Sequence, residues 1–242
     1  MAYRSSSIAV GNSTSIIGTA PVGLTDDDWM LALIVQDGTK TVSSVPTGWD
    51  LIATISNTGP DVQSAFVYEK VAASEGVSWT WDMSATGDWL VIVSAHSGRN
   101  TAGSLIVQGT TNNSNNASPV SVALTGVTAL ANDDVAWFAQ LDQVGGADVW
   151  GFAPPTDYTE RQDGAAAQWI QASLATRDNV SAGATGTLTG TATRTVGSSG
   201  AGFSGVVVAL PSTGGGPVTV GLSGSASTGG HGISVPNFQI PL

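Results

Sequence analysis

The central feature of the chain is the stretch Asp26-Asp27-Asp28-Trp29-Met30-Leu31-Ala32-Leu33-Ile34-Val35-Gln36, in which an acidic turn leads into an apolar run. A run of about seven apolar residues, with Asp before it and Gln-Asp-Gly after it, is typical of a strand buried on both faces, because a buried helix would be longer. The segment 126–140, with its own acidic turn at Asp133 and Asp134, repeats the pattern of 18–29. The chain therefore contains two related halves.

Further strands are expected on both sides of this run. The segment 77–83 alternates strictly, which places Val77, Trp79, Trp81 and Met83 on one face of a half-buried strand. The segments 89–96 and 203–210 are apolar runs. Two short strands, 7–10 and 13–18, are expected to meet at a tight turn at Gly11 and Asn12. Between the halves, 97–119 is expected to be rich in loops, with one strand at 105–107.

The arrangement of turns predicts the fold class. Turn signals recur about every eight to twelve residues without a helical period, which predicts an all-β antiparallel sandwich. The turn 46–49 (Pro-Thr-Gly-Trp) corresponds to the turn 155–158 (Pro-Thr-Asp-Tyr). We predict one jelly-roll-like β-sandwich over residues 1–211, built by internal duplication from pseudo-repeats at about 5–98 and 104–211. Two separate sandwiches are the alternative.

The C-terminal segment 212–242 differs in composition from the rest. It begins with the flexible linker Thr213-Gly214-Gly215-Gly216 and has too few apolar residues to form its own core. Some of these apolar residues alternate, so the segment can add as strands to the edge of another sheet or subunit. We predict a docking tail with the contact residues Val218, Val220, Leu222, Ile233, Val235, Phe238 and Ile240.

The composition excludes several classes of protein. The chain of 242 residues has 7 Lys and Arg against 18 Asp and Glu, which gives a net charge of −11. Binding to nucleic acid requires clustered basic residues, so we expect no nucleic-acid partner. There is no cysteine, and neither a secretory signal nor an apolar run long enough to cross a membrane is found. We therefore expect no membrane association, and release by lysis or within a particle.

Residues with catalytic potential are few. The two histidines, His96 and His231, lack the spacing of a zinc site, and no nucleophile elbow, phosphate loop or dinucleotide motif is present. A Ser/His/Asp triad stays open, because its members meet in space and not in sequence. We expect no enzyme and no cofactor.

The acidic turns, 26–28 and 133–134, have two interpretations. Their carboxylates are candidate calcium ligands, or they hydrogen-bond their own turns and fix the buried strands that follow. The sequence has no Asp-x-Asp-x-Asp-Gly loop, and we favour the structural interpretation.

The chain has eight tryptophans, a large number for a chain with so few charges. Four of them, Trp29, Trp79, Trp81 and Trp89, lie in apolar patterns and are expected in the core. Aromatic rings on a β surface can stack on sugar rings, so the candidate glycan-binding residues are Trp49, Trp150, Tyr158 and Trp169. Trp150, in a Gly-rich segment read as a loop, is expected to be the exposed ring.

Several segments resemble a known kind of module: Gly-Asn-Ser-Thr-Ser-Ile (11–16), Asp-Asp-Trp-Met-Leu-Ala (27–32), Val-Pro-Thr-Gly-Trp-Asp-Leu-Ile (45–52), Val-Tyr-Glu-Lys-Val-Ala (67–72), Glu-Gly-Val-Ser-Trp-Thr-Trp (75–81) and Val-Ile-Val-Ser-Ala-His-Ser-Gly (91–98). Together they resemble a β-sandwich module of bacteriophage structural proteins and bacterial surface proteins. The resemblance covers about 5–211 and consists of turn and core residues, so it implies a fold and a setting without a site.

The expected function follows from the resemblance and the composition. It is a non-enzymatic virion protein, a head-decoration, fibre or tail-associated component, attached through its C-terminal tail. Its expected location is the virion, and its expected partners are capsid or tail proteins and sister copies in a homo-oligomer. The alternative is a carbohydrate-binding module that recognises a host surface glycan.

Overall fold

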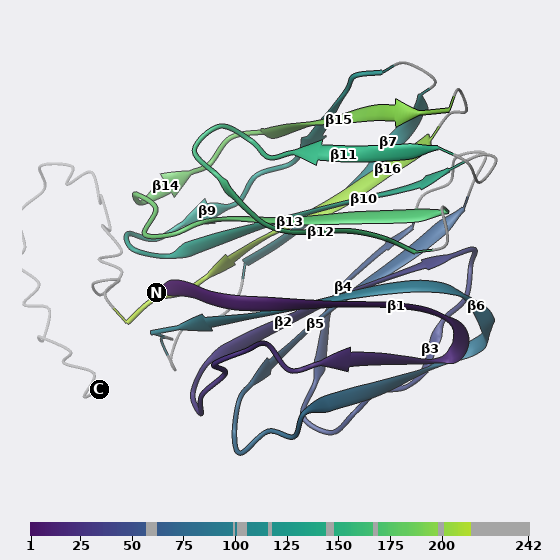
Figure 1. The fold of residues 1–242 in the computed structure, drawn as a ribbon. Coiled ribbons are helices and arrows are strands. Elements are labelled where there is room, and N and C mark those ends of the chain that lie inside the picture. Colours follow the sequence, from purple (N-terminus) through teal and green to yellow (C-terminus); the bar gives the residue numbers. More distant parts are fainter. Residues whose placement is uncertain are drawn as a thin grey trace, which may run out of the picture.

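The computed structural model describes residues 1–56, 62–98, 100, 106–115, 118–143, 148–166, 169–197 and 201–213. These residues form strands, turns and bends without a helix, and their strands pair antiparallel (Figure 1). The predicted all-β antiparallel class is confirmed. Within the described ranges there is accordingly no helix with the length and apolarity to cross a membrane.

The first half of the molecule, residues 1–98, forms one sheet. Its strands are β1 (Ala2–Thr19), β2 (Trp29–Asp37), β3 (Val42–Ser44), β4 (Asp50–Ser56), β5 (Gln63–Val71) and β6 (Ser78–Ser97). They follow the order β1-β6-β2-β5-β4, and β3 pairs with the early part of β6. The apolar strand β2 thus lies at the centre of its sheet.

The second half, residues 106–213, forms a five-stranded sheet, a three-stranded sheet and a short ladder. Its strands are β7 (Ile106–Asn115), β8 (Val120–Leu124), β9 (Thr128–Ala129), β10 (Asp134–Gln143), β11 (Val149–Ala153), β12 (Thr159–Ala166), β13 (Ile170–Arg177), β14 (Gly183–Ala184), β15 (Leu188–Val196) and β16 (Ala201–Leu210). The orders are β12-β13-β10-β16-β7, β11-β15-β8 and β14-β9. Of the strand predicted at 105–107, residues 106 and 107 lie in the longer β7, and residue 105 lies outside the described residues.

The two halves have the same strand order. Read from the opposite edge, β7-β16-β10-β13-β12 matches β1-β6-β2-β5-β4. Residues 15–19 of β1 pair with residues 78–82 of β6 as β8 pairs with β15, and β3 pairs with β6 as β11 pairs with β15. Each half therefore has five main strands and a smaller set of strand pairings. In the first half this smaller set belongs to the same sheet, whereas in the second half it is a separate three-stranded sheet.

The tight turn expected at Gly11 and Asn12 is wrong, because β1 runs without a break through both residues. Gly11 pairs with Trp89 on β6, and a Cβ atom at Gly11 would lie 2.4 Å from the Trp89 indole ring. The glycine therefore makes room for a ring and does not make a turn. The segments 77–83 and 89–96, expected as two strands, are likewise parts of the single strand β6.

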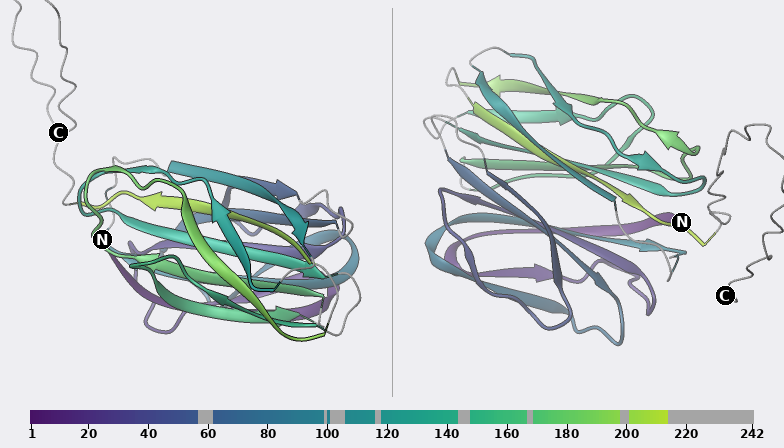
Figure 2. Two further views of the ribbon diagram at one scale, coloured as in Figure 1. Left: turned by 90° about the horizontal axis from the view of Figure 1, so that it is seen from above. Right: turned by 180° about the vertical axis from the view of Figure 1, so that it is seen from behind.

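Three apolar clusters form the core. One lies within the first half and one within the second half, and the third joins the main sheets of both halves. Alternate residues of β2 belong to two different clusters. Met30, Ala32 and Ile34 lie in the cluster of the first half, whereas Leu31, Leu33 and Val35 lie in the cluster that joins the two halves. The unbroken apolar run is thus explained by cover on both faces. Figure 2 shows the halves stacked as layers, with the N-terminus at their boundary.

The core positions expected from the tryptophan pattern are mostly confirmed. Trp29, Trp89 and the alternating set Trp79, Trp81 and Met83 are all buried. Val77 is the exception, with 86% of its surface exposed. It lies one residue before β6 begins, where the alternation of the strand does not yet apply.

Candidate functional site

The end of the molecule that holds the N-terminus also holds the last described residues of the chain. Strand β16 ends at Leu210, and residues 211–213 form what we call the tail root. Ser212 N donates to Asp133 Oδ1 at 3.1 Å, Thr213 N donates to Gly98 O at 3.2 Å, and Asn100 N donates to Pro211 O at 3.1 Å. The tail root is therefore bound to both halves. The predicted docking residues Val218, Val220, Leu222, Ile233, Val235, Phe238 and Ile240, and also His231, lie outside the described residues.

The two acidic turns have the same hydrogen bonds. Asp28 Oδ2 accepts from Thr25 N at 2.9 Å, and Asp133 Oδ2 accepts from Leu130 N at 2.8 Å. In each turn the residue before the aspartate has a positive φ, 69° at Asp27 and 68° at Asn132. The aspartates thus close the turns that start β2 and β10.

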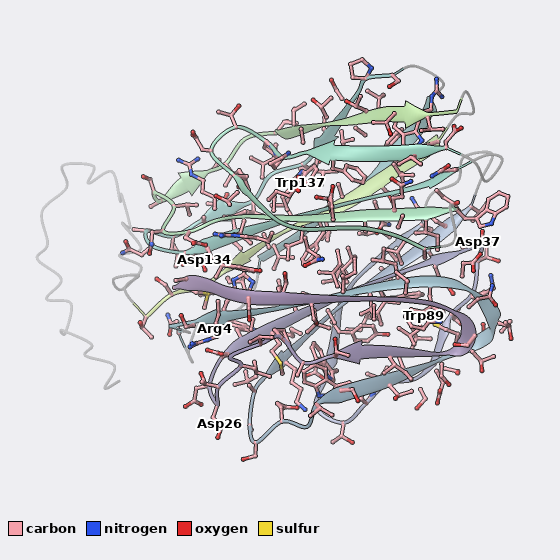
Figure 3. All side chains as sticks on the ribbon, in the orientation of Figure 1. Arg4, Asp26, Asp37, Trp89, Asp134 and Trp137 are labelled. Atoms are coloured by element: carbon pink, nitrogen blue, oxygen red, sulfur yellow. The ribbon has the colours of Figure 1, made fainter. Side chains whose placement is uncertain are left out.

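Asp26 and Asp28 of the first turn have further partners. Asp26 Oδ1 accepts from Ser74 N at 2.6 Å, and Arg4 Nε lies 2.7 Å from Asp28 Oδ2. Figure 3 labels Arg4 and Asp26, which both lie in the first half. A cavity of about 280 Å³ lies beside Arg4 and the three aspartates. Within the described ranges, His, Cys, Asp and Glu side chains do not gather in groups of three or more that could hold a metal ion.

A Ser, a His and an Asp meet between the halves. His96 Nδ1 lies 3.4 Å from Asp134 Oδ2, and His96 Nε2 lies 3.2 Å from Ser94 Oγ. With the proton on Nδ1, the imidazole donates to the carboxylate and accepts from the hydroxyl, which is the connectivity of a catalytic triad. Figure 3 shows Asp134 at the boundary of the two halves.

This group has no access to a substrate. All three side chains are fully buried, and the Tyr3 ring packs edge-on against the His96 ring at 5.8 Å. Asp134 Oδ1 also accepts from Asn179 N at 3.3 Å, so the carboxylate is bound on both sides. We conclude that the group is a polar link between β6 and β10.

A second buried polar group lies near the opposite ends of these strands. Gln140 Nε2 donates to Ser204 Oγ at 2.8 Å, and Gln63 Nε2 lies 3.3 Å from the same oxygen. Gln63 comes from β5 of the first half, whereas Gln140 and Ser204 come from the second half. The interface between the halves is therefore apolar at its centre and polar toward both ends, which fixes its register. The residues of neither polar group were predicted from the sequence, although a Ser/His/Asp group had stayed open.

The glycan-binding candidates differ in exposure. Trp49, Trp150 and Tyr158 are 4%, 5% and 9% exposed, whereas Trp169 is 39% exposed. The expected exposure of Trp150 is wrong, because this residue lies in β11 and points into the core of the second half. Its ring packs against that of Phe203 at 5.4 Å.

Tyr158 and Trp49 are equivalent turn residues. Tyr158 N donates to Pro155 O at 3.1 Å, and Trp49 N donates to Pro46 O at 3.3 Å. Both rings enter the core of their own half. Burial raises the pKa of the Tyr158 hydroxyl to about 12. Neither ring offers a face to a ligand.

A small cavity of about 190 Å³ lies where strand β11 faces β12 and β13. Trp150 N on β11 donates to Gln171 Oε1 at 3.1 Å, and Phe152 N donates to Asp163 Oδ2 at 3.5 Å. Side chains of the five-stranded sheet thus bind the edge of the smaller sheet. Partial burial, and to a smaller extent the charge of Glu160, raise the pKa of the Asp163 carboxyl to about 6. The lining residues are Val149, Trp150, Phe152, Asp163, Gly164, Ala165, Gln171 and Ala172.

Two of the candidate aromatic residues differ in their relation to the cavity. Trp150 lines it, whereas Trp169 comes directly before strand β13, which carries the lining residue Gln171. The backbone N–H of Trp169 donates to Ala166 O at 3.1 Å. Tyr158 lies at the other end of β12. Comparison of the chain with family models, curated proteins and solved structures found no match.

Proposed function

We propose that the protein is a non-enzymatic structural component of a bacteriophage particle, a head-decoration, fibre or tail-associated protein that is attached through residues 212–242. The observation that carries the proposal is the tail root, where residues 211–213 form backbone hydrogen bonds with Gly98 and Asn100 and donate one hydrogen bond to the Asp133 carboxylate. Because the C-terminal segment leaves the folded body at a fixed point, a partner that binds the segment also holds the body at a defined place. The partners are capsid or tail proteins and sister copies.

The proposed role as a non-enzyme is supported by the burial of the one Ser-His-Asp group that the described residues contain. Ser94, His96 and Asp134 have no exposed surface, so a substrate would require separation of the two halves. The few charges and the Ser-, Thr- and Gly-rich composition suit a protein exposed on a particle.

We further propose that the body arose by duplication of a β-sandwich. The shared strand order and the matching aspartate and proline turns support this origin. The core has one cluster in each half and one between them, which favours two sandwiches stacked face to face over a single jelly roll.

The test is removal of residues 214–242 with Thr213 kept as the last residue. We expect the shortened protein to keep the unfolding midpoint of the full chain, because the tail root is retained, and to be absent from purified particles. Particle content is measured by quantitative mass spectrometry of density-gradient fractions.

A second variant separates the apolar side chains of the tail from its length. It replaces Val218, Val220 and Leu222 by serine, which keeps the length and flexibility of the tail. This variant should also be depleted from particles if apolar docking is the mechanism. Incorporation of the shortened protein at the normal ratio to the major capsid protein would contradict the proposal.

Carbohydrate recognition is the second candidate function. It is favoured by Trp169, which is exposed and stands two residues before Gln171, a residue that lines the cavity together with Asp163.

A further inference from the structure

We propose that the cavity between β11, β12 and β13, together with Trp169, binds a single neutral sugar ring. The inference rests on the second candidate function and is independent of attachment through the tail.

Two polar side chains of the lining can bind hydroxyl groups. Gln171 Oε1 accepts from Trp150 N, and the amide Nε2 of the same side chain can donate. Asp163 Oδ2 accepts from Phe152 N, and the carboxylate, which also interacts with Ser173, can accept further hydrogen bonds. A donor and an acceptor on neighbouring strands suit the adjacent hydroxyls of a sugar ring. Both side chains are already held by their bonds to β11, so binding requires little ordering of the site.

The apolar part of the site comes from Trp169, Val149 and Ala165. Trp169 is 39% exposed, and Val149, at the rim of the cavity, is 48% exposed. An exposed indole ring can pack against the C–H face of a sugar. The remaining lining is built from small residues and from the buried edges of Trp150 and Phe152.

Size and charge define the class of ligand. A volume of about 190 Å³ is smaller than the roughly 300–1,000 Å³ of sites for larger organic ligands, so one ring fits and an extended oligosaccharide does not. The Asp163 carboxylate and the net charge of −11 disfavour anionic sugars. The ligand is therefore a neutral sugar, free or at the end of a glycan.

The test uses the full-length protein and the methyl glycosides of glucose, galactose, mannose and N-acetylglucosamine, with methyl glucuronide as the anionic probe. Binding is followed by saturation-transfer NMR and by tryptophan fluorescence. We expect at least one neutral glycoside to bind saturably with a dissociation constant on the order of 1 mM, and the glucuronide to bind more weakly. Absence of saturable binding by every neutral probe, or equal binding of the glucuronide, would overturn the proposal.

Variants locate the site. Ala165→Leu fills the cavity from an exposed position, and Trp169→Ala removes the exposed ring; each should weaken binding about tenfold, which corresponds to about 1.4 kcal/mol. Leu51→Ala, at an exposed apolar residue of the first half, is the control and should leave binding unchanged. Unchanged affinity in both cavity variants would refute the site. Either result leaves particle incorporation unaffected, so this proposal and the tail proposal fail separately.

Discussion

The two halves share a strand order but distribute their large side chains differently. In the first half, Trp49 packs edge-to-face on Trp79 and on Trp81, with ring centroids 5.2 Å apart in each pair. In the second half, Trp137 lies four residues after its turn aspartate, where the first half has Ala32. Space for Trp137 is provided by Gly190, since a Cβ atom there would lie 2.7 Å from the indole ring (Figure 3). Strand pairing and turn bonds are therefore kept, while individual core positions exchange large and small residues.

The largest effect is expected from emptying either aromatic core. Trp81 and Trp137 are fully buried in the first-half and second-half clusters, so Trp81→Ala and Trp137→Ala should each destabilise the protein by about 3–5 kcal/mol. Equilibrium urea unfolding, followed by fluorescence and circular dichroism, measures the change.

The same experiment tests whether the halves unfold together. Because the third cluster joins both main sheets, we expect one transition in each variant. Two separate transitions, with only one of them shifted in each variant, would show that the halves unfold independently and that the third cluster does not couple their stabilities.

An intermediate effect is expected at the interface between the halves. Asp134 lies where the first half has Trp29, directly after the turn aspartate. Asp134→Ala leaves His96 Nδ1 and Asn179 N without their acceptor, so we expect a loss of about 1–3 kcal/mol. Asp157→Asn removes the charge of an exposed carboxylate 3.6 Å from Arg177 and suits the positive φ of 68° at this position, so it is the control, with an expected change within about 0.5 kcal/mol. Equal losses in the two variants would contradict the role of the polar link.

The smallest effect is expected at Asp163, where the first half has Thr54 at the equivalent ladder position. Partial burial raises the pKa of Asp163 from 3.8 to about 6, so the folded protein binds a proton more readily than the unfolded chain. The stability that this proton contributes is complete below about pH 4 and is lost as the pH rises through about 6. Asp163→Asn removes this dependence.

The measurement compares urea midpoints of the wild type and the variant at about pH 4 and pH 7.5. We expect Asp163→Asn to be more stable relative to the wild type at the higher pH. Thr54→Ala, the matched change in the first half, should give the same difference at both values. A pH-independent difference for Asp163→Asn would mean that its carboxyl titrates as it does in the unfolded chain.

The central strands were predictable from the sequence because both of their faces are covered by apolar clusters. The runs that became β2 and β10 therefore lack a polar face, and the aspartates before them mark where each strand begins. The equivalence of the turns that end in Trp49 and Tyr158 was also readable, because both depend on a local bond to a proline carbonyl.

The errors arose where distant contacts decide the role of a residue. Gly11 reads as a turn residue, but the Trp89 ring that requires it is far away in the sequence. Trp150 was read as part of a Gly-rich loop, although its spacing from Phe152 is that of two residues on one face of a strand. The cavity had no sequence signal, because its lining comes from three strands, β11, β12 and β13, whose packing against one another the residue pattern does not show.

The position of β16 also determines how the molecule carries mechanical load. A pull on Thr213 acts along β16, which is paired on one side with β10 and on the other with β7. Both ladders resist such a force in shear, so that many hydrogen bonds must fail together, whereas an edge strand pulled sideways loses them one by one. The C-terminal strand is therefore held within the body by two ladders, and a force applied at Thr213 is shared between them.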